Sequence, residues 1–423
     1  MTINRDLFII TDKTISADDF FNIKDKYLAR FETHRRIIMQ AQSPLDLNAA
    51  MIAAREAGKE LFVCHRHFKE DEMRQLYRKH ECDLMIIKTD KAEIVEEDRP
   101  GIETSGRGFI YVFTSGTTGE AKIARHRWDS IEHSSAFVGD RLKNKCWMMC
   151  YSPTSYAGLQ VFFSAFNNNG KIYYPPSNYE QIARGMAKNE VRVVSATPTF
   201  WRLLITSWPE DLPAVKLEQA TLGGEIITQD ILDAIKKRFR PERITHIYAS
   251  TEAGTAIIVS DGLAGFPEKL LDTEKGVSLR IVDDLLEIKA PGAMEGYLGR
   301  ESNISNEGWV MTGDMVESRE GRIFFLGRAD GMINVGGMKV LPEEVEGALN
   351  SLEEIRDSRV YAKRSPIIGS LVMAEVVLNP GTAFDELSIK NRLKNILADY
   401  KIPKVIVQTE EIGISEHGKK LRK

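Results

Sequence analysis

The sequence predicts an α/β protein with a large N-terminal domain of mostly parallel sheets and helices, a β-rich subdomain, and a small α+β C-terminal domain. Three observations predict this fold class. Short apolar runs alternate with helical patterns through the first part of the chain. Short alternating runs separated by Gly and Asp follow residue 275, and a smaller mixed segment comes last. At 423 residues, the chain is long enough for two or more domains.

The segment between residues 36 and 88 carries the clearest alternation. Strands are expected at residues 36–40, 61–64 and 84–87, with helices at 46–56 and 71–80. The alternation recurs later, with strands at 191–194, 220–222 and 244–248 and a helix at 229–240 that Pro241 ends. Strands separated by helices of about ten residues predict a mostly parallel sheet that helices cover on both faces.

The pattern changes after residue 275. Antiparallel strands are expected at residues 278–282, 285–289 and 322–326. Beyond them the sequence predicts a helix at 342–349, strands at 358–362 and 371–378, and a helix at 387–397. Turn residues at 327–331 separate two strand-like segments, which places the domain boundary near Asp330. The two domains are therefore expected at residues 1–329 and 330–423.

The composition gives no global reason to expect nucleic acid or an anionic membrane as a partner. The net charge is −4, from 57 Lys+Arg and 61 Asp+Glu, and 43% of the residues are hydrophobic. The four cysteines form no closely spaced pairs, the N-terminus does not read as a signal peptide, and no apolar run approaches the ~20 residues that span a bilayer. We expect a soluble cytoplasmic protein without membrane insertion.

A loop rich in glycine and hydroxyl groups is the strongest local signal. It follows the strand-like residues 108–112 and comprises Thr114, Ser115, Gly116, Thr117, Thr118, Gly119 and, three residues on, Lys122. Glycines let successive N–H groups face an anion, hydroxyls add donors, and Lys122 adds charge. The loop is typical of a phosphate site, although the usual P-loop pattern GxxxxGK[ST] is absent. An ordinary Ser/Thr/Gly surface loop is the alternative.

The order Thr-Ser-Gly-Thr-Thr-Gly followed by a lysine resembles the signature loop of the adenylate-forming superfamily. That superfamily contains acyl-CoA synthetases, aryl acid ligases, luciferases and the adenylation domains of peptide synthetases. Its other motifs follow in order along this chain, and the resemblance covers essentially everything from about residue 36. The ordered set is far more specific than any single motif.

Residues 248–254 resemble the family's Tyr-Gly-x-Thr-Glu segment. There the Thr bonds the α-phosphate, the Glu holds Mg²⁺ and the aromatic ring flanks adenine, which implies these roles for Thr251, Glu252 and Tyr248. Ala249 stands where Gly is usual, and Ser250 completes the stretch along the nucleotide. A carboxylate suits a hard cation that bridges phosphates. Taken alone, a Thr-Glu pair after a strand is more often a helix cap.

Two glycine-containing motifs are expected to complete the nucleotide site. Gly223, Gly224 and Glu225 resemble a turn that lines the adenine and acyl sites, although a plain strand-to-helix turn has the same pattern. Residues 308–314 resemble Gly-Trp-x-x-Thr-Gly-Asp, whose Asp accepts bonds from both ribose hydroxyls. A carboxylate is the natural acceptor for a diol, so Asp314 is the best single candidate for nucleotide recognition. An Asp in a β-turn is the alternative.

The C-terminal motifs imply a rotating domain. In the Gly-Arg-x-Asp motif, the resemblance implies that Arg328 contacts the ribose and that Asp330 is the hinge about which a small mobile domain swings. Gly336 and Gly337 resemble the loop past which the pantetheine arm of CoA runs. Peptide-synthetase domains carry a bulkier version there, which favours a CoA ligase. Lys419 takes the position of the catalytic lysine in the family's last motif, although a frayed basic tail has similar composition.

The implied activity has two halves. With MgATP, a small-molecule carboxylic acid is activated to acyl-AMP with release of pyrophosphate, and the acyl group then passes to the CoA thiol. The acyl pocket is expected to comprise Tyr156, Ala157, Thr197, Pro198, Gly223 and Ser250. Tyr156 fills the usual His position of Pro-x-x-His-x-x-Gly, and this segment has no Asp to pair with an amino-acid ammonium. An aryl or medium-length aliphatic acid is therefore expected.

Three alternatives stay open. The acceptor is the phosphopantetheine of an acyl carrier protein; or the chain binds nucleotide without catalysis; or it is a kinase or GTPase, which the missing P-loop disfavours. Other reactive side chains are expected to pack rather than react. His65, His67, His80 and Cys82 match no metal-ligand spacing, and Cys146 and Cys150 stand at helical spacing among apolar residues.

Overall fold

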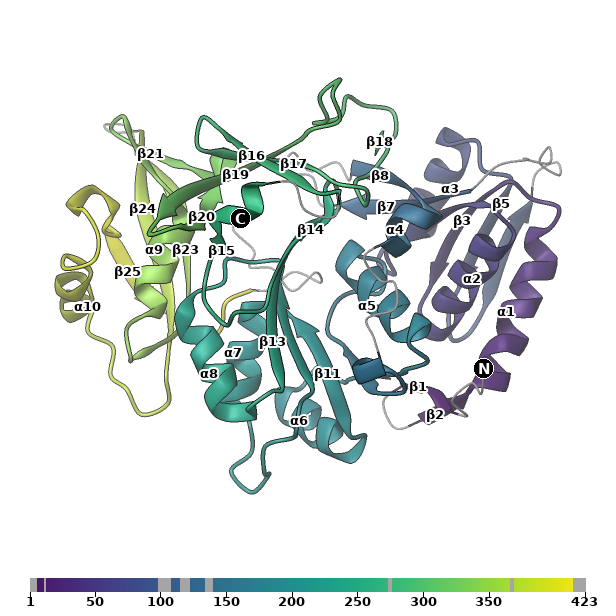
Figure 1. The fold of residues 1–423 in the computed structure, drawn as a ribbon, viewed down its shortest axis with the longest axis horizontal. Helices are drawn as coiled ribbons and strands as arrows, with labels where there is room; N and C mark the ends of the chain where they lie inside the picture. The colour runs from purple at the N-terminus through teal and green to yellow at the C-terminus, as the bar shows by residue number, and fades with distance from the viewer. Residues whose placement is uncertain are drawn as a thin grey trace.

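The computed structural model describes residues 6–10, 13–97, 108–114, 122–133, 140–272, 276–365 and 369–413. Within these ranges the chain forms two α/β sheets side by side, an antiparallel sheet over one end, and a smaller mixed sheet at the C-terminal side (Figure 1). Ser115 to Gly119 and Lys419 lie outside the described residues.

The first sheet has the strand order β18-β8-β7-β4-β3-β5-β6. Its strands are β3 (Arg36–Ala41), β4 (Glu60–Cys64), β5 (Leu84–Lys88), β6 (Glu93–Glu97), β7 (Phe109–Thr114), β8 (Lys122–Arg127) and β18 (Gly296–Tyr297). Helices α1 (Ala17–Phe31), α2 (Pro44–Glu56) and α3 (Glu70–Lys79) connect or cover them. The four central strands pair in parallel, as the alternating pattern predicts, and β6, β8 and β18 add antiparallel edges.

The second sheet has the order β14-β13-β12-β11-β9-β10-β1-β2. Its strands are β1 (Asp6–Ile10), β2 (Lys13–Ser16), β9 (Cys146–Met149), β10 (Lys171–Tyr174), β11 (Val191–Ala196), β12 (Gln219–Gly223), β13 (Arg243–Ser250) and β14 (Gly254–Val259). Helices α4 (Trp128–His133), α5 (Tyr156–Asn167), α6 (Tyr179–Lys188), α7 (Pro198–Thr206) and α8 (Gln229–Phe239) accompany it. Its six inner strands pair in parallel, so the predicted fold class is confirmed here too.

Cys146 lies on strand β9 and not on a helix, so the helical interpretation of the Cys146–Cys150 spacing is wrong. Every residue of this strand is buried between parallel neighbours. A short run that is apolar throughout has no periodicity, and a buried strand then looks the same as a buried helix. The expectation that both cysteines pack in the core is confirmed, because Cys146 is buried and Cys150 packs against the same apolar cluster.

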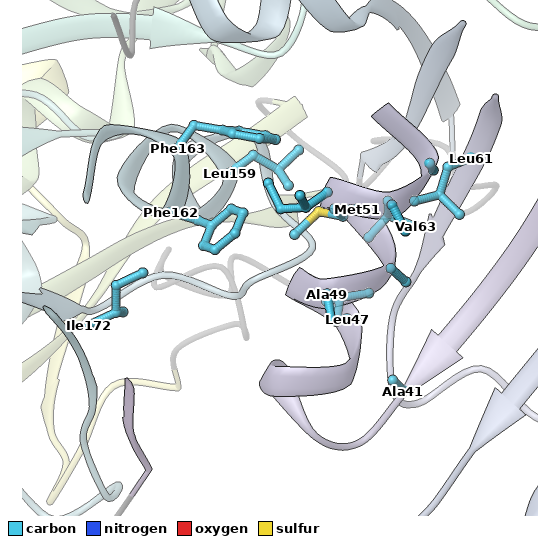
Figure 2. Packing of buried hydrophobic residues seen from close by; sticks show 14 of the residues in the cluster. Ala41, Leu47, Ala49, Met51, Leu61, Val63, Leu159, Phe162, Phe163 and Ile172 are labelled. Atoms are coloured by element: carbon cyan, nitrogen blue, oxygen red, sulfur yellow. The ribbon is translucent and has the colours of Figure 1, made fainter. Parts of the chain in front are cut away.

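One hydrophobic core joins the two sheets. Helix α2 is buried along its whole middle, residues 46–54, and four of those nine residues are alanines that let neighbours approach closely. Figure 2 shows Met51 of α2 facing Leu159 and Phe162 of α5, with Leu61 and Val63 of the first sheet behind the helix. A helix that is apolar on all sides is expected between two layers. The two sheets are thereby fixed relative to each other.

The β-rich subdomain is an antiparallel sheet in the order β15-β20-β19-β17-β16. Its strands are β15 (Phe266–Pro267), β16 (Ser278–Val282), β17 (Leu285–Lys289), β19 (Val310–Arg319) and β20 (Arg322–Arg328). Antiparallel pairing joins β16 to β17, β17 to β19 and β19 to β20, which confirms the prediction for this segment.

The C-terminal segment has a core of its own. Its elements are β21 (Ile333–Val335), β22 (Met338–Val340), α9 (Pro342–Asn350), β23 (Ile355–Ser365), β24 (Gly369–Leu378), α10 (Glu386–Leu393) and β25 (Val405–Gln408). Its apolar cluster draws every member from Ile333 onward. This supports the boundary at Asp330, which stays a prediction. None of the helices in the described ranges is long and apolar enough to cross a membrane.

Candidate active site

The Thr-Glu pair lies at the tip of a β-hairpin. Thr251 and Glu252 occupy the turn between β13 and β14, so the helix-cap alternative does not hold. Gly254 begins β14 with φ +70°, and a Cβ atom there would lie 2.4 Å from the carbonyl oxygen of Gly292. The N–H of Met294 donates to the carbonyl of Glu252 at 2.9 Å. The hairpin tip is therefore held tightly against the segment around residue 292.

Two side chains meet Glu252 and its surroundings from other parts of the chain. The hydroxyl of Tyr297, on β18, donates to Oε1 of Glu252. The ammonium of Lys122, at the start of β8, lies 5.3 Å from the centre of the Tyr297 ring. Sequence reasoning missed Tyr297, because a lone Gly-Tyr pair carries no chemical signature. Lys122, which is predicted to bind phosphate, and Glu252, which is predicted to bind the metal, thus share Tyr297 as a neighbour.

Tyr248 connects the hairpin with the β-rich subdomain. Its ring stacks on Phe325 of β20, with centroids 4.8 Å apart and planes 4° apart, and its hydroxyl donates to Oδ2 of Asp314 on β19. Burial, and then the charge of Asp314, raise the pKa of Tyr248 well above its usual value, so the hydroxyl remains a donor. The structure brings the predicted adenine and ribose residues together.

Arg328 joins Asp314 to the predicted hinge. Its Nε and Nη2 donate to the two carboxylate oxygens of Asp330 at 2.9 and 3.3 Å, and its Nη1 reaches the carbonyl of Thr312 at 3.1 Å and Oδ1 of Asp314 at 3.5 Å. The hydrogen bond from Arg328 lowers the pKa of Asp330. Gly313 has φ +74° and would place a Cβ atom 3.2 Å from Arg328 Nη2. Glycine at 313 therefore leaves room for the guanidinium.

The Gly-Gly turn lies beside the same hairpin. Gly223 ends β12, and a Cβ atom there would lie 3.3 Å from the carbonyl oxygen of Ile247 and 4.0 Å from the hydroxyl of Tyr151. Gly224 has φ +83°, and its Cβ position is 3.6 Å from Cγ2 of Thr197. Thr197, which is predicted for the acyl pocket, thus lies against the residue that follows Gly223. Tyr151 is a neighbour that the sequence did not indicate.

Glu225 has a structural partner. Its Oε2 accepts from the N–H and the hydroxyl of Thr199 at 3.0 and 2.9 Å. Thr199 is in the first turn of α7, which begins at Pro198 and is capped by Thr197. A carboxylate at a helix N-terminus satisfies free N–H groups there. Glu225 therefore fixes the turn against α7, and its predicted contact with nucleotide stays a prediction.

Tyr156 starts α5 and lies against a histidine that the sequence did not single out. The rings of Tyr156 and His126 have centroids 5.4 Å apart. His126 is completely buried, and burial lowers its pKa to about 4 despite the backbone of Thr251 and the charge of Glu252, which raise it. His126 is therefore neutral at physiological pH. Ala157 packs against the core next to Tyr156.

The ends of the glycine-rich loop are paired. Thr114, the last residue of β7, is opposite Lys122, the first residue of β8. The two described residues that flank the loop therefore lie side by side, and one of them, Lys122, faces the Tyr297 ring. The predicted phosphate contacts of Ser115, Gly116, Thr117, Thr118 and Gly119 fall outside the described residues and stay predictions.

The predicted pantetheine glycines lie at an exposed tip. Gly336 and Gly337 form the two-residue turn between β21 and β22, with φ +59° and +90°, as a tight hairpin turn requires. The N–H of Gly337 donates to Oδ1 of Asn334 at 2.8 Å. Among the described residues, nothing lies within 4 Å of either Cβ position.

The residues present fit a magnesium ion that arrives with phosphate. Across the described ranges, no three His, Cys, Asp or Glu side chains are placed to hold a metal among themselves. His65 instead bonds Thr154, with Nδ1 2.6 Å from Oγ1. Glu252 offers a single hard carboxylate, and Tyr297 contacts both this carboxylate and Lys122. Mg²⁺ is usually held by one or two carboxylates together with phosphate oxygens and water, so this donor set suits it.

Known proteins resemble the chain in sequence and in fold. The family profile "AMP-binding enzyme" matches residues 107–298, and "AMP-binding enzyme C-terminal domain" matches residues 344–419. The 2-succinylbenzoate–CoA ligase of Listeria innocua is 27% identical over 331 residues, which cover 73% of this chain and 67% of that ligase. The chain spans 61% and 60% of the length of two further curated relatives.

Two solved structures share the fold. ATP-bound MatB from Rhodopseudomonas palustris has a TM-score of 0.81 at 18% identity, covering 99% of this chain and 94% of that one. The o-succinylbenzoate CoA synthetase of Bacillus subtilis, in complex with ATP and a magnesium ion, has a TM-score of 0.76 at 20% identity, with coverage of 99% and 96%. The two profiles match in order, over most of the chain, on a fold that these structures share. The chain therefore belongs to the AMP-binding, adenylate-forming enzyme superfamily that includes the AMP-forming acid–thiol ligases.

Proposed function

We propose that this protein activates a carboxylic acid with MgATP as acyl-AMP, releases pyrophosphate, and transfers the acyl group to the thiol of CoA. The observation that carries the proposal is the convergence of the hairpin tip with two subdomains. On one side Tyr297 contacts both Glu252 and Lys122, and on the other Tyr248 contacts Asp314. These contacts support a phosphate and metal site on one side of Thr251 and a ribose site on the other.

The chain's residues divide the work along the nucleotide. Asp314 accepts from the ribose hydroxyls through its carboxylate, which Tyr248 and Arg328 also contact. Thr251 donates to the α-phosphate. Lys122 and, by its position in the family motif, Lys419 offset charge that develops at the reacting phosphorus. When bound at Glu252, Mg²⁺ neutralises the pyrophosphate that leaves.

The acid is bound between α5, α7 and the end of β12. Tyr156, Ala157, Thr197, Pro198, Gly223 and Ser250 are the residues proposed to line this pocket. Thr197 lies against Gly224, the residue that follows Gly223, and Tyr156 packs against His126. None of these pocket side chains is charged. An aryl or medium-length aliphatic acid without a further charge fits that lining.

The acceptor is proposed to be CoA, whose pantetheine arm would pass the Gly336–Gly337 turn after the small domain rotates. The alternative acceptor is the phosphopantetheine of an acyl carrier protein. Both would use the same turn, and turnover with free CoA separates them. A cytoplasmic location, without nucleic acid or membrane partners, completes the proposal.

Exchange of labelled pyrophosphate into ATP should depend on both a carboxylic acid and Mg²⁺. The reason is that only a reversible acyl-AMP step returns pyrophosphate to ATP. The measurement is an exchange panel of aryl and C4–C10 aliphatic acids, each with Mg²⁺ or with EDTA. The panel also identifies the substrate.

Glu252→Gln tests the proposed metal ligand in the same panel, because it keeps the shape of the side chain and removes the metal-binding charge. It should abolish the dependence on Mg²⁺ together with most of the exchange. Splitting of ATP to ADP and phosphate would favour a kinase-like activity instead. Binding of ATP without exchange for any acid would favour the non-catalytic alternative.

A further inference from the structure

Three chain segments converge on Tyr297 through backbone contacts. Strand β18 pairs with β8, so that Tyr297 lies opposite Ala124, and the N–H of Leu298 donates to the carbonyl of Ile123 at 2.8 Å. The neighbouring Met294 N–H bonds the carbonyl of Glu252. Tyr297 is therefore fixed both to the strand that begins with Lys122 and to the hairpin that carries Glu252.

The side chain of Tyr297 stands between a cation and an anion. Its ring faces the ammonium of Lys122 at 5.3 Å, and its hydroxyl donates to Oε1 of Glu252. None of the ion pairs among the described residues joins Lys122 to Glu252.

We propose that Tyr297 is a positioning residue that keeps Lys122 and Glu252 apart, so that each is available to MgATP. The proposal rests on the function proposed above. Its hydroxyl orients the metal-binding carboxylate, and its ring holds the phosphate-binding ammonium. One side chain thereby prepares both halves of the metal–phosphate site.

The hydroxyl of Tyr297 affects metal binding through Glu252, because one oxygen of a carboxylate can accept a hydrogen bond while the other coordinates a metal. Tyr297 bonds Oε1 of Glu252, and no hydrogen bond or ion pair from the described residues reaches Oε2, which can then coordinate the metal. Hydrogen-bonded partners of a ligating carboxylate fix its direction, and their loss commonly lowers metal affinity about 10- to 100-fold. Removing only the hydroxyl should therefore weaken metal binding and leave the cation in place.

The ring of Tyr297 acts on Lys122 by separating its ammonium from the carboxylate of Glu252. A lysine and a glutamate that touch form an ion pair, which ATP would have to break before either group could bind it. Aromatic rings attract an ammonium without neutralising it. Removing the whole ring should therefore let Lys122 contact Glu252, and nucleotide binding should weaken even without metal.

Calorimetric ATP binding, with Mg²⁺ and with EDTA, tests the two halves of this proposal separately. Tyr297→Phe should weaken ATP binding about tenfold or more in Mg²⁺ and leave it unchanged in EDTA. Tyr297→Leu should weaken binding in both conditions. Adding Glu252→Gln to Tyr297→Leu should restore the affinity in EDTA, because Lys122 then has no partner to contact. A purely structural role for Tyr297 would not give that rescue.

Tyr248→Phe is the matched control, since it also removes a hydroxyl that donates to a carboxylate, at the ribose end. It should change the affinity for ATP equally with and without Mg²⁺. Equal loss in both conditions for Tyr297→Phe, or no loss, would overturn the positioning role. If Tyr297→Leu does not fold, Tyr297→Phe alone decides. A wild-type protein whose ATP affinity ignores Mg²⁺ would instead overturn the metal site of the proposed function.

Discussion

Lys419→Ala should slow acyl-adenylate formation by a few orders of magnitude and leave thioester formation from preformed acyl-AMP nearly unchanged. A preorganised charge beside a developing oxyanion contributes about 3–5 kcal/mol to a transition state. The family motif places this lysine on the small domain, where it would face the site only during adenylation. Single-turnover measurement of each half-reaction tests the prediction. Lys420→Ala, the adjacent lysine, is the control and should affect neither half.

Gly337→Leu should have the opposite effect. A leucine at the exposed hairpin tip would obstruct the pantetheine path and slow thioester formation while sparing pyrophosphate exchange. Because Gly337 has φ +90°, part of any effect could come from backbone strain. Gly381→Leu places the same side chain at φ +81° in the same segment, so it measures that strain alone.

If Lys419→Ala impaired both half-reactions equally, the account with two domain arrangements would fail, and the basic C-terminal tail would have a structural role.

Asp314→Ala should weaken ATP binding by a factor of tens to hundreds. Hydrogen bonds to a charged acceptor contribute about 2–3 kcal/mol when the acceptor is removed from a site that excludes water. The loss should appear in calorimetry with and without Mg²⁺, because Asp314 lies at the proposed ribose end of the site, where Tyr248 and Arg328 converge. Thermal unfolding of the variant checks that the affinity change does not reflect a lost fold.

A charge-matched pair makes the test of Asp314 specific. Asp314→Asn keeps one carbonyl oxygen and should lose less affinity than alanine does. Asp283→Asn removes the same charge from an exposed turn between β16 and β17 and should leave ATP binding unchanged. Unchanged affinity in folded Asp314→Ala would remove this residue from the nucleotide site.

The sequence predicted the layers of the fold because each layer has its own periodicity. Parallel strands read as buried apolar runs between helices, and the subdomain at 278–328 reads as alternating strands. Prediction failed where periodicity is missing, as in the four buried residues of β9. The helix expected at 387–397 ends at Leu393, a boundary that propensity alone does not fix.

The candidate site was predictable wherever a motif lies within a few consecutive residues. Tyr248, Glu252 and Asp314 are of this kind, and the structure brings their neighbourhoods together. Tyr297 and His126 were missed because their roles depend on strand pairing and burial, not on local order. Glu225 lies within a recognisable motif, but the motif does not indicate that Thr199 of α7 would be its hydrogen-bond partner.

Arg328 would link the proposed ribose recognition thermodynamically to the proposed domain movement. The same guanidinium bonds Asp330, at the proposed hinge, and approaches Asp314, at the proposed ribose site. If the small domain rotates about Asp330, that rotation must alter the pair with Arg328 and so alter what Asp314 offers the nucleotide. Reciprocity then requires that a nucleotide bound at Asp314 shift the domain equilibrium by the same coupling free energy. When pyrophosphate leaves and the ribose contact changes, the domain equilibrium would therefore shift. That shift would bias which half-reaction comes next.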